Sequence, residues 1–97
     1  MPASSALEAD IRQRVEELET LFDGIVSCRV TVEMPHRSHH QGQHFRARIE
    51  LGVPGERLVA GRSPDLDASH EDAHIAVHDA FRAAKRQLGD YVRLLRA

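Results

Sequence analysis

Arginine and lysine side chains recur along this chain at spacings that would gather them on a folded surface. Near the C-terminus they follow one another at helical spacings of three, four and seven residues. Earlier in the chain, alternation typical of strands places further arginines on one face. Such groups can contact the phosphates of structured RNA, largely by shape rather than by base identity. The candidate RNA-binding residues are Arg29, Arg37, Arg46, Arg48, Arg82, Lys85, Arg86 and Arg93.

The charge of the whole chain does not itself indicate a nucleic-acid partner, because the formal net charge is −2 at pH 7. Any such site must come from local clustering of basic residues. The alternative is a solvated surface that serves only solubility. Asp79 stands three residues before Arg82, and Asp90 stands near Arg86 and Arg93, so local ion pairs fit that alternative.

Histidines form two groups in the sequence, one at helical spacing and one in a polar stretch. Two histidines at i and i+4 can share a metal ion, but a defined site needs three or four ligands, and no Cys pair is present to complete one. We therefore expect surface imidazoles and no bound metal, with a metal-binding or protein-interaction domain as an alternative. The helical group is His70, His74 and His78, and the other is His36, His39, His40 and His44.

Signals for catalysis, cofactors and membranes are weak. Cys28 is expected at an inward strand position, as a small core residue rather than a nucleophile. We find no nucleophile elbow, no glycine-rich phosphate loop and no paired catalytic carboxylates, so we expect no enzyme and no cofactor. No apolar run approaches the roughly 20 residues of a membrane span. A single cysteine suits a reducing cytosol, and we expect a cytoplasmic protein without a membrane partner.

Periodic aliphatic residues predict two amphipathic helices that position these side chains. The first is expected to begin at a capping box over residues 5–8, with Ser5 as the cap, and to end near Gly24. The second is expected to be capped by Ser69 and to run to the C-terminus. Their predicted buried positions are Leu7, Ile11, Val15, Leu18 and Phe22, then Ala73, Val77, Ala80, Ala84, Leu88, Tyr91 and Leu95.

Alternation of apolar and polar residues predicts strands over 25–34, 44–53 and near 56–61, with a polar loop over 35–42. Pro54 and Gly55 favour a type II turn between the last two strands. The result is a single domain spanning 1–97 with the α+β order α-β-β-β-α. Its antiparallel three-stranded sheet would carry both helices on one face and leave the arginine-bearing face wet. The inward residues of the first strand are predicted to be Val26, Cys28, Val30 and Val32.

Four short segments, taken in chain order, carry a family resemblance. Glu71–His74 reads EDAH and Arg86–Leu88 reads RQL. Phe22–Ile25 reads FDGI at a helix-to-strand junction, and His36–Arg37 opens a polar loop. In this order the chain resembles the ribosome hibernation promoting factor and ribosome-associated inhibitor A family, also called the sigma-54 modulation protein family. Of the candidate RNA-binding residues, we carry over only Arg86 from a matched motif.

The resemblance implies a non-enzymatic factor that associates with the small ribosomal subunit and its ribosomal RNA. Such a factor would occupy the channel for messenger and transfer RNA, block translation under stress and protect idle ribosomes. The chain resembles the short type, without the domain by which long members pair ribosomes. A generic double-stranded RNA-binding module is the alternative with the same element order, although its second helix would open with a lysine cluster instead of the sequence SHED at 69–72.

The chain departs from the family pattern at three places. His74 stands where a tyrosine is common, and Ala83 stands where a lysine is common. The family's opening strand is not seen before the first helix. Either that strand is encoded upstream of Met1, or the sheet has three strands. In the second case the strand over 25–34 would be an open edge, so we expect either a homodimer through that edge or a monomer whose edge is twisted or shielded by a loop.

Overall fold

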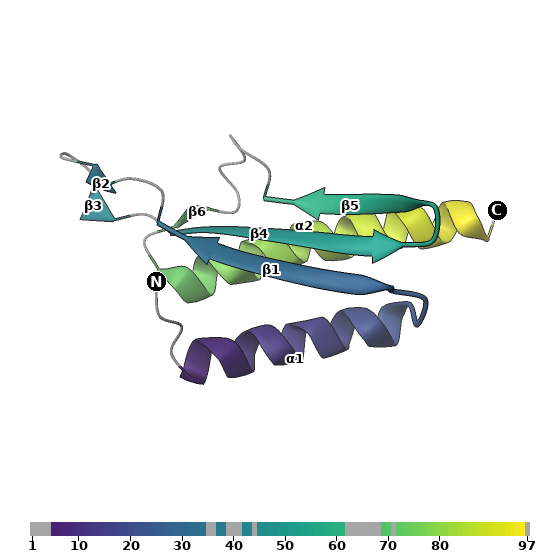
Figure 1. Ribbon diagram of the computed structural model, residues 1–97, viewed down its shortest axis with the longest axis horizontal. Coiled ribbons are helices and arrows are strands. Elements are labelled where there is room, and N and C mark those ends of the chain that lie inside the picture. The colour runs from purple at the N-terminus through teal and green to yellow at the C-terminus, as the bar shows by residue number, and fades with distance from the viewer. Residues whose placement is uncertain are drawn as a thin grey trace.

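The computed structural model describes residues 5–34, 37–38, 42–43, 45–61, 69–70 and 72–96. Two helices and three long antiparallel strands follow one another in the predicted order α-β-β-β-α (Figure 1). Three shorter strands accompany them. The elements are α1 (Ser5–Leu21), β1 (Ser27–Glu33), β2 (Arg37–Ser38), β3 (Gly42–Gln43), β4 (Phe45–Val53), β5 (Glu56–Ala60), β6 (Ser69–His70) and α2 (Ala73–Leu95).

Strand β4 is the centre of the sheet. β1 pairs with it in antiparallel register from Ser27 opposite Gly52 to Glu33 opposite Arg46. β5 pairs with its other edge, and β6 continues along that edge. Gly55 in the β4–β5 turn has a φ of 86°, the left-handed conformation that the predicted turn requires. β2 and β3 form a separate two-stranded pair, although residues 35–42 were predicted to be a loop.

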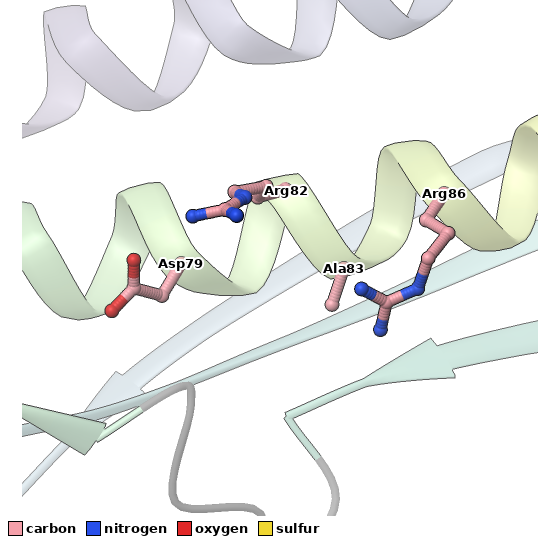
Figure 2. A pocket seen from close by; sticks show the side chains of 4 residues that line it. All are labelled: Asp79, Arg82, Ala83 and Arg86. Atoms are coloured by element: carbon pink, nitrogen blue, oxygen red, sulfur yellow. The ribbon is translucent and has the colours of Figure 1, made fainter.

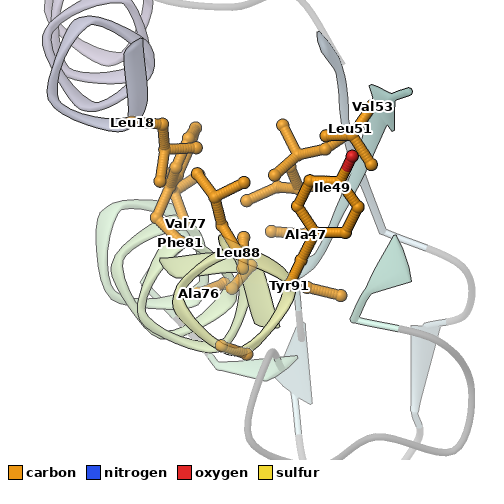
Figure 3. Close-up of a cluster of buried hydrophobic side chains, with 14 of the residues drawn as sticks. Leu18, Ala47, Ile49, Leu51, Val53, Ala76, Val77, Phe81, Leu88 and Tyr91 are labelled. Carbon is orange, nitrogen blue, oxygen red and sulfur yellow. The ribbon is translucent and has the colours of Figure 1, made fainter. Parts of the chain in front are cut away.

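The hydrophobic core lies between the sheet and the helices, both of which cover one face (Figures 1 and 3). Alternate residues of β4 point into it, because side chains alternate between the faces of a strand. Ile49 of β4 and Leu88 of α2 are both 0% exposed. The hydroxyl of Tyr91 donates a hydrogen bond of 2.7 Å to the carbonyl of Pro54, which ties the end of α2 to the β4–β5 turn. The ring of Phe22 meets the ring of Tyr91 edge-on, which joins α1 to the same place.

The start of α2 differs from the prediction. Asp72, not Ser69, caps the helix: its backbone is extended and its carboxylate accepts a 2.8 Å hydrogen bond from the amide of His74. Ser69 instead pairs with Arg46 in the sheet. Both residue types favour a cap position, so the choice was decided by the pairing of β6 with β4. At the first helix, Ser5 already belongs to α1 and does not precede it.

Two predicted inward residues are exposed. Val26 is 75% exposed and precedes β1, although its amide donates a hydrogen bond of 2.8 Å to the carbonyl of Gly52. Leu95 is 57% exposed, because it lies in the last turn of α2, beyond the contact between Tyr91 and Pro54. The other predicted core positions are buried or pack against the core.

Candidate nucleic-acid interface

The structure places six of the eight candidate RNA-binding residues on two surfaces. The helices bury one face of the sheet, so the outward residues of the strands lie on the opposite face. The exposed side of α2 is turned away from that sheet. The outer sheet face carries Arg29, Arg46 and Arg48, and the helix flank, as we name it, consists of Arg82, Lys85 and Arg86.

On the outer sheet face, acidic residues stand among the arginines. Arg29 lies opposite Glu50 in the β1–β4 register. Glu50 also lies 3.5 Å from Arg48 and 3.9 Å from Arg57, measured between the guanidinium nitrogen and the carboxylate oxygen. Arg57 was not predicted as a candidate residue. Its place opposite Gly52 depends on the β4–β5 register, which the sequence pattern does not specify. The cluster therefore keeps a positive surplus, but part of its charge is already paired.

On the helix flank, basic groups stand free of such pairs. Within the described residues, none of Arg82, Lys85 and Arg86 has an ion pair, although Asp79 was the expected partner of Arg82. Figure 2 shows both arginines projecting from α2 beside a surface pocket of about 240 Å³, with Ala83 and Asp79 in its lining. These cations are held on a rigid helix and remain available to a polyanion.

Arg14 on α1 extends this basic surface towards the first helix. It joins Arg82 and Lys85 in lining a groove of about 170 Å³ between the two helices. Its guanidinium lies 2.8 Å from a carboxylate oxygen of Asp10 and donates a 3.0 Å hydrogen bond to Nδ1 of His78. Arg14 was not among the residues predicted from the sequence. Its position could have been predicted from its spacing, because it stands four residues before the buried Leu18, at the edge of the apolar stripe of the first helix.

Asp10 connects the helices at a second point. Its other carboxylate oxygen lies 3.2 Å from Nδ1 of His74 on α2. Partial burial acts to raise the pKa of Asp10, but the hydrogen bond from His74 and the neighbouring Arg14 lower the pKa below its usual value of 3.8. Thus His74 and His78 contact α1 residues and contribute to helix packing.

The three side chains of Arg86–Leu88, one of the segments that carry the family resemblance, have different roles. Arg86 is exposed on the helix flank. Gln87 donates a hydrogen bond of 3.0 Å to the carbonyl of Val59 on β5, and Leu88 is fully buried. One turn of α2 therefore fixes the helix on the sheet and presents a cation on the opposite side.

Of the last two candidate residues, one lies at the end of α2 and the other in β2. Arg93 lies in the final turn of α2 and forms an ion pair with Asp90, as the solvated-surface alternative expected. Arg37 belongs to β2, opposite Gln43, and its side chain lies outside the described part of the chain.

Cys28 points to the core side of β1 and is half-buried. Burial raises the pKa of its thiol, and the charge of Glu19 adds to that shift, so the thiolate form is disfavoured. Among the side chains that the structure describes, no three His, Cys, Asp or Glu residues gather closely enough to hold a metal ion. Most of the predicted histidine groups, including His36 and His70, have side chains outside that part.

The fold and the surfaces define a small α+β domain that displays basic side chains on a helix flank and on an open sheet face. Residues 1–96 match the family described as sigma 54 modulation protein / S30EA ribosomal protein, and the chain belongs to this family. It is a family of ribosome-associated modulation factors that is not known for enzymes. No curated protein matches the chain. None of the described helices has the length and apolar character to cross a membrane.

Proposed function

We propose that the protein binds ribosomal RNA of the small ribosomal subunit and inhibits translation there, as a single ribosome-associated domain. The match over residues 1–96 to the S30EA family carries this proposal. The mechanism is steric: the domain occupies the channel for messenger and transfer RNA and is held by contacts between basic side chains and phosphates. It acts in the cytoplasm during stress, protects idle ribosomes and performs no chemical reaction.

The helix flank supports this proposal best as the main RNA contact. Arg82, Lys85 and Arg86 are exposed and unpaired among the described residues, so binding a phosphate does not require an existing ion pair to break. Charge-assisted hydrogen bonds from such groups are the stronger class of hydrogen bond. Arg14 lies at the neighbouring groove, but its guanidinium is already paired with Asp10, so phosphate would compete with that carboxylate for it.

The outer sheet face supports a second, weaker contact. Arg48 and Arg57 approach Glu50, so phosphate would compete with that carboxylate for them. The face is open to solvent in the described structure and keeps more arginines than glutamates. Because the two surfaces lie on opposite sides of the domain, simultaneous contact would require RNA on both sides, as in a channel.

A generic double-stranded RNA-binding module is less well supported. Its second helix would present lysines at the N-terminus to phosphates. Here α2 begins at Ala73 behind the carboxylate of Asp72, which caps the helix. A negative charge at that place opposes phosphate binding.

The experiment that tests the function is sedimentation with purified ribosomal subunits, together with translation in vitro. We expect co-sedimentation with the small subunit, inhibition of translation, and steep weakening by salt because each phosphate contact releases counterions. Recovery at the top of the gradient at low salt, with intact small subunits present, contradicts the proposal. Equal binding to the large subunit contradicts its subunit specificity.

A matched pair of double variants tests the helix flank. Arg82→Ala with Arg86→Ala should weaken binding by on the order of 2 kcal/mol, because each charged contact contributes about 1 kcal/mol. The control is Arg12→Ala with Arg96→Ala, which removes the same charge from exposed positions outside the candidate surfaces. Equal losses in the two variants would show that net charge, not the flank, determines binding.

A further inference from the structure

Two arginines and one aspartate of α2 line the same surface pocket. The pocket has a volume of about 240 Å³, and its described lining consists of Asp79, Arg82, Ala83 and Arg86. Helical spacings of three, four and seven residues place these side chains along one side of α2, as Figure 2 shows. Within the described residues, none of the three charged side chains forms an ion pair or a hydrogen bond. The pocket therefore offers a ligand two cations and one carboxylate.

Phosphate contacts alone do not explain Asp79. Its carboxylate repels a phosphate that approaches Arg82 or Arg86 in the same pocket. The side chain is half-buried, so a bound strand would remove more water from it. An ionised carboxylate can only accept hydrogen bonds, and it loses free energy when it is desolvated without a donor. A ligand that fits this pocket must therefore bring a hydrogen-bond donor beside its phosphates.

The RNA backbone carries such a donor on every sugar. The ribose 2′-hydroxyl can donate and accept hydrogen bonds, and it is the group that lets a protein tell RNA from DNA at a given site. It sits on the carbon next to the one that bears the 3′ phosphate oxygen. A strand that places a phosphate on Arg82 and Arg86 can thus bring a 2′-hydroxyl to the carboxylate of Asp79.

We propose that Asp79 accepts a hydrogen bond from a ribose 2′-hydroxyl while Arg82 and Arg86 hold the adjacent phosphate; this inference rests on the RNA binding proposed above. Asp79 is then a specificity-determining residue. It favours a backbone that carries the hydroxyl, and it opposes one that lacks it, because the carboxylate would meet phosphates without a donor. The arginines supply affinity, and the aspartate supplies selection for RNA.

The neighbouring groove repeats this combination of charges. Glu17, Arg82 and Lys85 line the groove of about 170 Å³ between the helices, so Arg82 belongs to both hollows. Within the described residues the carboxylate of Glu17 has no ion pair. A strand that crosses α2 at Arg82 meets cations and one unpaired carboxylate on each side. Asp79 is the stronger selector, because it is half-buried and Glu17 is exposed.

Replacing the 2′-hydroxyl tests this contact. Fluorescence anisotropy should compare one hairpin of small-subunit ribosomal RNA with its 2′-fluoro version, in which fluorine preserves the A-form geometry and the phosphates but cannot donate. The unmodified chain should bind the 2′-fluoro hairpin more weakly. Asp79→Ala should reduce this ratio of affinities about fivefold, mainly because the 2′-fluoro hairpin binds more tightly once the carboxylate is removed.

Two further variants separate the hydrogen bond from the charge. Asp79→Asn keeps an accepting oxygen and should keep most of the ratio. Asp90→Ala removes the same charge from α2 outside the pocket, and it should change both affinities by the same factor. An unchanged ratio in Asp79→Ala overturns the inference and leaves a base as the only donor to Asp79, and an equal fall in Asp90→Ala overturns it as well. Failure of the unmodified chain to bind either hairpin instead contradicts the proposed function, and this inference with it.

Discussion

Arg14 on α1 and His78 on α2 are joined by a hydrogen bond of 3.0 Å, although they are 64 residues apart in the sequence. An arginine side chain can only donate, so Nδ1 of His78 is the acceptor and carries no proton in this arrangement. The bond fixes the arginine at the mouth of the groove between the helices. A neutral imidazole here orients a cation and adds no charge of its own.

This geometry predicts unequal effects of the two residues on RNA binding. Arg14→Gln should weaken binding to a small-subunit ribosomal RNA fragment about fivefold at neutral pH, because a charged contact is lost. His78→Gln keeps a neutral acceptor and should leave the affinity nearly unchanged. Fluorescence anisotropy at fixed salt measures both. Equal losses with intact circular dichroism would assign direct RNA contact to His78.

The ion pairs of Asp10 predict a pH-dependent contribution to stability. Its pKa is lowered in the folded state, so the carboxylate stabilises the fold above its usual value of 3.8, and this contribution is lost as pH falls through the folded pKa. Asp10→Asn should reduce the free energy of unfolding at pH 7 by about 0.5–1 kcal/mol. The difference from the unmodified chain should shrink towards pH 3 in urea denaturation. Glu16→Gln, exposed on the same helix, serves as the control; a constant difference across this range would contradict the assignment.

Two glycines should respond to alanine in opposite directions. Gly61 has a φ of 82°, and an added Cβ would collide with the carbonyl oxygen of Ala47. Gly61→Ala should therefore destabilise the fold by about 1–3 kcal/mol. Gly89 lies inside α2 with open space around its Cβ position, so Gly89→Ala should stabilise by up to about 1 kcal/mol. Thermal unfolding measures both, and a shift of the same sign would contradict the geometry.

Local sequence patterns determined the element order and the exposed or buried side of each element. Alternation over β4 and helical spacing over α2 place Ile49 and Leu88 in the core, because the periods of strands and helices are local properties of the backbone. The same periods predict Arg82 and Arg86 on the outside of α2. Proline followed by Gly55 predicts the left-handed residue of the turn. The ordered segments were also sufficient to indicate the family.

Only the tertiary structure decided which residues from different elements lie together and which lie apart. The sheet has one apolar face, and both helices must bury it, which separates the helix flank from the outer sheet face. The register of β5 brings Arg57 to Glu50, and the pairing of β6 leaves the cap of α2 to Asp72. The contact of Arg14 with His78 likewise depends on how α1 packs beside α2. Contacts between distant segments depend on packing and register, which local periodicity does not specify.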